Sequence, residues 1–115
     1  MESNKNYFNP LNAGLREEDY QKIISVLVQF PKVEEVILYG SRAKGNYQAY
    51  SDIDITLKGS DLSLDIQHQI AIALDDLYLP YTFDLSILSA INNQELIDHI
   101  NRVGILFYKS ASITK

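Results

Sequence analysis

The stretch at residues 40–55 reads GSRAKGNYQAYSDIDI, and it follows an apolar run, VILY, at residues 36–39. The apolar run is typical of a strand buried on both faces, and Gly40 ends it. Glycine lets the backbone approach a ligand closely, and a helix that starts here would direct its first N–H groups toward an anion. We therefore expect Gly40 and Ser41 to contact phosphate oxygens.

A pair of carboxylates follows this Gly-Ser after ten intervening residues. In a strand, Asp52 and Asp54 would point to one face, while Ile53 and Ile55 would point to the other. Two like charges on one face repel each other, and a divalent cation between them relieves the repulsion. Hard cations such as Mg²⁺ take carboxylate oxygens together with substrate phosphates. An isolated pair could equally be a solvated strand face, but the Gly-Ser at this spacing favours a metal site.

The pattern G-S-R-A-x-G followed by S-D-I-D resembles the signature of the polymerase-β-like nucleotidyltransferase superfamily. Within it, the chain resembles the minimal nucleotidyltransferases, small bacterial proteins encoded beside HEPN-domain partners. The resemblance extends from the helix expected before residue 36 to the C-terminal strand. It implies the polymerase-β-like nucleotidyltransferase fold.

The apolar periodicity predicts alternating helices and strands in the rest of the chain. Helices are expected from about residue 17 to 30, at 42–44, 63–78 and 92–102, and strands at 34–39, 52–58, 81–88 and 105–108. This order favours an α+β protein, a two-layer mixed β-sheet with helices on one face and the site on the other. Residues 1–14 are expected to be a poorly ordered lead-in, 15–110 a single nucleotidyltransferase domain and 111–115 a C-terminal tail.

A third carboxylate is predicted for the same site. The strand at 81–88 alternates apolar and polar residues, which places Asp84 on its polar face. The family resemblance implies that Asp52, Asp54 and Asp84 together are catalytic and bind the metal, with Asp84 also acting as base toward the acceptor hydroxyl. A solvated strand position is the ordinary alternative for Asp84.

Three further residues of the loop are candidates for nucleotide binding, each with an ordinary structural alternative. Ser41 would hydrogen-bond the triphosphate, or cap the short helix. Arg42 would neutralise phosphate charge, or be a surface cation. Ser51 would touch a phosphate or support the loop. His68 and His99 lie on predicted helices without a metal-spaced partner, and we expect no role for either.

Composition excludes several classes of function. The net charge of −5 argues against broad contact with duplex nucleic acid, which requires clustered Lys and Arg. The absence of cysteine excludes disulfides and thiolate metal sites. No apolar run approaches the roughly 18 residues of a membrane span, and the N-terminus does not read as a signal peptide. We expect a cytoplasmic protein without a membrane partner.

The resemblance implies a specific reaction. One or two Mg²⁺ ions and ATP as nucleotide donor would serve the transfer of AMP to a tyrosine hydroxyl of a HEPN-domain RNase toxin. The chain would be the antitoxin and would form a hetero-oligomer with that toxin. Two alternatives stay open: a non-catalytic antitoxin that acts by binding alone, and an adenylyltransferase that modifies a small-molecule hydroxyl such as that of an antibiotic.

Overall fold

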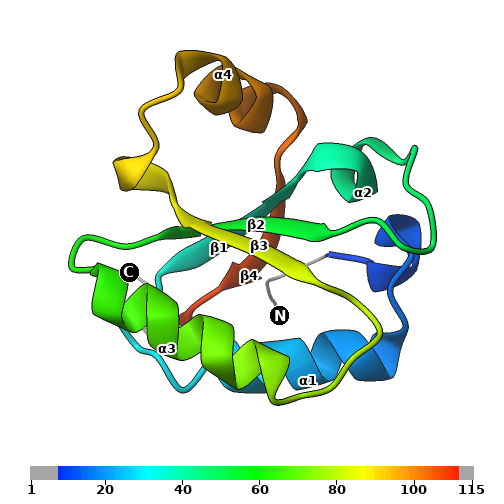
Figure 1. Ribbon diagram of the computed structural model, residues 1–115, viewed down its shortest axis with the longest axis horizontal. Helices are drawn as coiled ribbons and strands as arrows, with labels where there is room; N and C mark the ends of the chain where they lie inside the picture. Colours follow the sequence, from blue (N-terminus) through cyan, green and yellow to red (C-terminus); the bar gives the residue numbers. More distant parts are fainter. Residues whose placement is uncertain (1–7, 112–115) are drawn as a thin grey trace.

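The computed structural model describes residues 8–111, which build one mixed sheet and the helices that pack on it (Figure 1). The strands are β1 (Glu35–Tyr39), β2 (Ile53–Lys58), β3 (Phe83–Ile87) and β4 (Ile105–Lys109), and their order in the sheet is β3-β2-β1-β4. β1 is antiparallel to both of its neighbours, whereas β2 and β3 are parallel. The expected α+β class with a mixed sheet is confirmed.

The α-helices follow the predicted order, and all of them except α2, which starts two residues earlier than expected, have shorter spans. They are α1 (Glu17–Leu27), α2 (Gly40–Lys44), α3 (Leu64–Asp75) and α4 (Gln94–Val103), with 3-10 helices η1 (Pro10–Ala13) and η2 (Leu88–Ala90). α3 begins where the Ser63 side chain accepts a hydrogen bond from the Ile66 N–H. It ends three residues before the predicted limit because Tyr78 has a φ of +53°, in the left-handed region. None of the helices in the described part has the length and apolar character needed to cross a membrane.

The two faces of the sheet differ in chemistry because side chains alternate along each strand. On one face, β1 and β2 bury an aliphatic core against α1 and α3, formed by Val36, Leu38, Ile53, Ile55 and Leu57 with Ile23, Leu27, Ile70 and Leu74. The residues between them, Tyr39, Asp54 and Thr56, point to the other face. The carboxylates therefore lie on the face away from the main core.

α4 departs from the expectation that the helices share one face. Figure 1 shows α1 and α3 on one side of the sheet and α4 with α2 on the other. α4 contacts β1 and α2. Gly104, directly after α4, allows this close packing, because a Cβ there would crowd the Ile37 side chain. The site face is thus partly covered by α4 rather than open throughout.

The N-terminal lead-in is ordered where the structure describes it. η1 is capped by the Asn9 side chain, which accepts from the Leu11 N–H, and Ala13 and Leu15 are buried. The expectation of a poorly ordered segment is therefore wrong for residues 8–14, because Pro10 and Ala13 are buried and anchor them in the core. The rest of the expected lead-in, 1–7, and residues 112–115 of the expected tail lie outside the described residues.

Candidate active site

Gly40 joins the end of β1 to α2 and lies directly against one of the carboxylates. Its φ is +74°, a conformation that favours glycine. A Cβ at this position would collide with Oδ2 of Asp54. The expected phosphate-binding turn and the expected metal-binding strand therefore meet here.

The three carboxylates lie along two neighbouring strands. Asp54 on β2 and Asp84 on β3 are paired in the parallel register, so their side chains leave the same face side by side. Asp52 comes just before β2, and its Oδ1 accepts a hydrogen bond from the Thr82 hydroxyl. Asp52 and Asp84 are exposed, whereas Asp54 is half-buried.

Negative charge dominates the electrostatics around Asp54 and Asp84. Partial burial, followed by the charges of Asp84 and Asp52, raises the pKa of Asp54 to about 6, and Arg42 opposes the rise. Oxygen ligands with excess negative charge fit a hard divalent cation such as Mg²⁺. As the side chains stand, however, no three Asp, Glu or His groups within residues 8–111 converge closely enough to hold an ion. Asp54 and Asp84 are brought together, and Asp52 is turned toward Thr82.

Arg42 has a different place from the one expected of a phosphate ligand. It is 1% exposed, and its guanidinium lies 5.4 Å from the ring centroid of Tyr47 and 5.2 Å from that of Tyr81. A buried cation needs partners for its donors. These are four backbone carbonyls, those of Ala13, Gly14, Ala49 and Ser51. Arg42 therefore ties the N-terminal segment to the loop before β2 and does not face the site.

The two serines of the loop have distinct positions. Ser41 is half-buried in the first turn of α2, but it does not cap this helix, because α2 already begins at Gly40. The Ser51 hydroxyl accepts from the Gln48 N–H at 2.8 Å, and the Ser51 carbonyl accepts from Arg42. Ser51 thus supports the loop, one of the two roles predicted for it. Phosphate contact by Ser41 stays a prediction.

Sequence reasoning missed three residues around this site. His99 of α4 accepts a hydrogen bond from the Gly40 N–H, and its ring meets that of Tyr39 edge-on. Burial raises the pKa of Tyr39, and the charges of Asp84 and Asp54 add to the rise. The alternation of strands could have placed Tyr39 beside Asp54 and Thr82 beside Asp52. Nothing in the sequence pattern could have placed His99, since its contact depends on how α4 packs.

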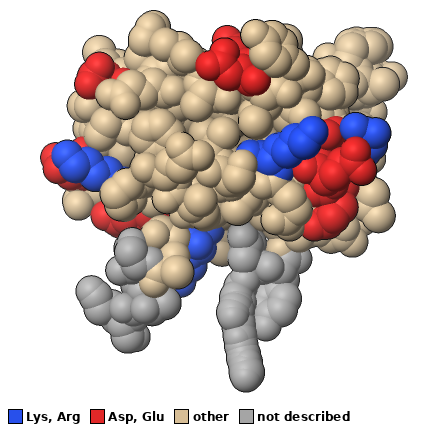
Figure 2. All heavy atoms as spheres, turned by 90° about the horizontal axis from the view of Figure 1, so that it is seen from below, with Lys and Arg blue, Asp and Glu red and all other residues tan. Residues whose placement is uncertain are grey.

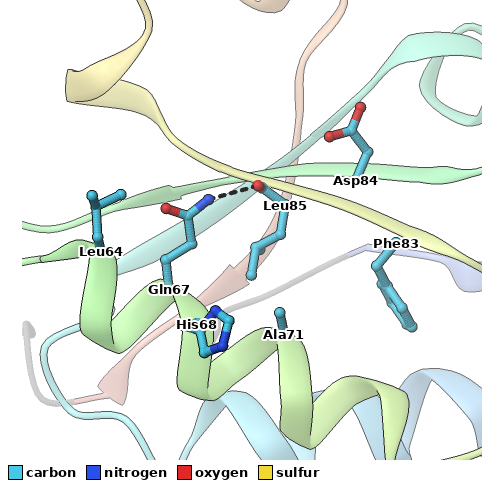
Figure 3. A pocket seen from close by; sticks show the side chains of 7 residues that line it. All are labelled: Leu64, Gln67, His68, Ala71, Phe83, Asp84 and Leu85. Carbon is cyan, nitrogen blue, oxygen red and sulfur yellow. Dashed lines mark hydrogen bonds between the residues drawn. The ribbon is translucent and has the colours of Figure 1, made fainter.

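A cavity of about 580 Å³ adjoins the site at the outer edge of the sheet (Figure 3). It lies between α3 and β3 and is lined by Leu64, Gln67, His68, Ala71, Phe83, Asp84 and Leu85. The Gln67 side chain donates to the Leu85 carbonyl at 2.8 Å. Figure 3 shows Asp84 on the opposite side of β3 from Phe83. Asp84 therefore borders both the cavity and the carboxylate face.

The chain is similar in sequence to a known protein family and in fold to several solved structures. The family model described as Polymerase beta, Nucleotidyltransferase matches residues 21–112. A crystal structure of a toxin-antitoxin with AMP-PNP is similar with a TM-score of 0.65 and 25% identity, over 81% of this chain and 75% of that chain. A mutant of the MntA-HpeT toxin-antitoxin is similar with a TM-score of 0.63 and 26% identity, over 80% and 73%.

A third solved structure shares the fold at lower identity. It is the tri-AMPylated HEPN toxin of Shewanella oneidensis in complex with MNT antitoxin, with a TM-score of 0.61 and 22% identity, over 84% of this chain and 74% of that chain. No curated protein matches the chain.

Proposed function

Because the chain belongs to the polymerase beta nucleotidyltransferase family, we propose that it transfers AMP from ATP to a hydroxyl of a HEPN-domain toxin and so acts as its antitoxin. The observation that carries the proposal is the contact between Gly40 and Asp54, with Asp84 in register on the next strand. The similar solved structures support the choice of donor and partner, since one contains AMP-PNP and another is a tri-AMPylated toxin with its antitoxin.

In this proposal the carboxylates bind the metal, and the turn at Gly40 and Ser41 binds the phosphates. Asp54 and Asp84, together with Asp52 once it turns from Thr82, would hold one or two Mg²⁺ ions, which would neutralise phosphate charge and orient the reacting groups. Gly40 would let the phosphates approach the first turn of α2, where Ser41 would donate its hydroxyl to a phosphate oxygen. Arg42 takes no part at the phosphates in this proposal, because its donors are bound by backbone carbonyls.

Asp84 is the group best placed to meet the acceptor. It is exposed at the outer strand of the sheet, beside the cavity along α3. It would orient the acceptor hydroxyl and take its proton as the acceptor oxygen bonds to the α-phosphorus and pyrophosphate leaves. Most of the rate acceleration would come from positioning and charge stabilisation, without a covalent enzyme intermediate.

Surface charge supports a protein partner over a nucleic-acid backbone. Figure 2, which views the α1 and α3 side, shows basic side chains beside acidic ones and no continuous basic area on that face. Three of the cations on the described surface are paired, Lys32 with Asp61, Arg16 with Asp19 and Lys58 with Glu35. Binding of a nucleic-acid backbone requires clustered, unpaired cations.

The proposal is tested by mass spectrometry of the HEPN partner after incubation with the chain, ATP and Mg²⁺. We expect the partner to gain AMP units with the wild type and none with Asp52→Ala/Asp54→Ala. The matched control is Asp75→Ala/Asp76→Ala, which removes two exposed carboxylates at the end of α3 and should leave transfer unchanged.

The two alternatives predict other outcomes of the same experiment. If the partner is unmodified yet is bound and inhibited equally by the wild type and the Asp52→Ala/Asp54→Ala variant, the chain is a binding antitoxin. If the partner is neither modified nor bound, while AMP appears on aminoglycoside hydroxyls offered as acceptors, the acceptor is a small molecule.

A further inference from the structure

His99 connects α4 to Gly40, the first residue of the expected phosphate-binding turn. Its Nε2 accepts a hydrogen bond from the Gly40 N–H at 3.2 Å. The imidazole ring is half-buried and packs edge-on against Tyr39, with ring centroids 6.1 Å apart and an interplanar angle of 81°. α4 and α2 are also in contact along this boundary. The imidazole is therefore held from two sides, with its acceptor nitrogen directed at Gly40.

The Gly40 N–H needs an acceptor from outside its own helix. The first N–H groups of a helix have no intrahelical partner. Tyr39, at the N-cap position of α2, provides no side-chain hydrogen bond to the helix. His99 performs this capping role from a segment 59 positions away in the sequence. An acceptor at Nε2 requires a neutral imidazole whose proton is on Nδ1.

The direction of the first turn of α2 depends on this contact. Gly40 has a left-handed φ, and it lies so close to the carboxylate of Asp54 that there is no room for a Cβ. The Gly40 N–H is already bound by His99, which leaves the groups of Ser41 to meet a phosphate. A small rotation of Gly40 would move Ser41 relative to the carboxylates.

We propose that His99 is a positioning residue for the nucleotide, which holds Gly40 so that Ser41 and the carboxylate pair face the same phosphates. The inference rests on the proposed nucleotidyl transfer and adds to it a residue from α4. It also assigns α4 a function: through His99, this helix fixes the orientation of Gly40 and Ser41.

The test compares His99→Leu, which removes the acceptor and fills similar space, with His99→Gln, whose amide oxygen can accept in place of Nε2. Asn101→Ala is the matched control, because Asn101 is an exposed residue of the same helix, α4. The quantities to measure are the Kd for ATP with Mg²⁺ by calorimetry, the KM and kcat of AMP transfer, and hydrogen exchange of the Gly40 amide by NMR.

We expect His99→Leu to weaken ATP binding and raise KM by about tenfold, as for the loss of one hydrogen bond that orders a ligand site. The Gly40 amide should exchange faster in this variant. His99→Gln should return the Kd for ATP to within about threefold of the wild-type value. A change of this size corresponds to less free energy than one hydrogen bond contributes. Asn101→Ala should bind ATP like the wild type.

Two outcomes would overturn the inference. One is an unchanged ATP affinity in a folded His99→Leu variant with faster Gly40 exchange. The other is a His99→Gln variant that is folded but as impaired as His99→Leu, which would assign the effect to ring packing. If the wild type binds ATP but transfers no AMP, the proposed function fails, and the ATP affinities and amide exchange still decide the role of His99.

Discussion

At the scale of single residues, Gly40 is under two constraints that can be separated by experiment. Its φ of +74° disfavours any L side chain, and its Cα faces Asp54 so closely that a methyl group cannot be added without moving the carboxylate. Gly45, at the other end of α2, has a φ of +89° but open space where a Cβ would lie. The two glycines share the backbone constraint, and only Gly40 has the steric one.

We therefore expect Gly40→Ala to abolish AMP transfer and Gly45→Ala to retain it. Each substitution should cost about 1–2 kcal/mol of unfolding free energy from left-handed strain. Gly40→Ala should cost more, because Asp54 must also shift. Urea unfolding and the transfer rate measure the two effects. Equal activity of the two variants would show that the contact between Gly40 and Asp54 has no role in the reaction.

Strand alternation was enough to predict which acidic side chains share a face. Asp54 and Asp84 lie in register on the face away from the aliphatic core, as the pattern of β2 and β3 indicated. The position of Arg42 could not be predicted, because its partners come from the N-terminal segment and from the loop before β2. His99 was missed for the same reason, since packing of α4 brings it to Gly40.

At the scale of elements, the existence and order of the helices and strands followed from periodicity, whereas their ends depended on local contacts. α3 ends at Asp75, three residues before the left-handed Tyr78, and the sequence pattern does not reveal this end. The packing of α4 on the second face depends on the close approach at Gly104, a tertiary feature. The loop between α2 and β2 lacks regular structure, and its shape follows from the hydrogen bonds of Arg42.

Replacing Arg42 tests this account of the loop. Arg42→Lys keeps the charge but loses the fork that reaches several carbonyls at once. We expect it to lower the unfolding free energy by about 2–4 kcal/mol, since hydrogen bonds to a buried charged group are worth about 1.5–3 kcal/mol. Lys44→Ala, at an exposed position of the same helix, should change it by less than about 0.5 kcal/mol.

Denaturant unfolding and ATP affinity together discriminate the two roles of Arg42. A folded Arg42→Lys variant with unchanged stability and weaker ATP binding would contradict the structural role. This result would instead support the predicted contact between Arg42 and a phosphate.

At the scale of the whole molecule, the two faces of the sheet have different roles: one stabilises the fold and the other carries the candidate site. One face carries aliphatic side chains buried against α1 and α3, and the other carries carboxylates whose mutual repulsion Arg42 relieves only in part. The reaction and the stability of the fold are therefore linked through Asp54. Its charge lowers the stability of the free protein, and a cation bound at the site would reverse this effect.

The sign of that linkage gives a prediction for the whole chain. The folded pKa of Asp54, about 6, lies above its ordinary value of 3.8, so the folded state keeps a proton that the unfolded state has released. This stabilising contribution is complete below pH 4 and is lost as the pH rises through about 6. We expect Asp54→Asn to remove this loss and to be more stable than the wild type at pH 7. Urea unfolding across pH 4–8 measures the difference, and Asp76→Asn, at an exposed position, serves as the control.

Addition of Mg²⁺ to the same series discriminates a metal site from simple repulsion. An ion that binds the folded state alone at ten times its Kd stabilises it by about 1.4 kcal/mol. At pH 7, Mg²⁺ should therefore raise the unfolding free energy of the wild type and of Asp76→Asn, but not that of Asp54→Asn. An equal gain in all three proteins would mean that Mg²⁺ acts through general screening of the negative chain. The carboxylate pair would then be repulsive without being a metal site.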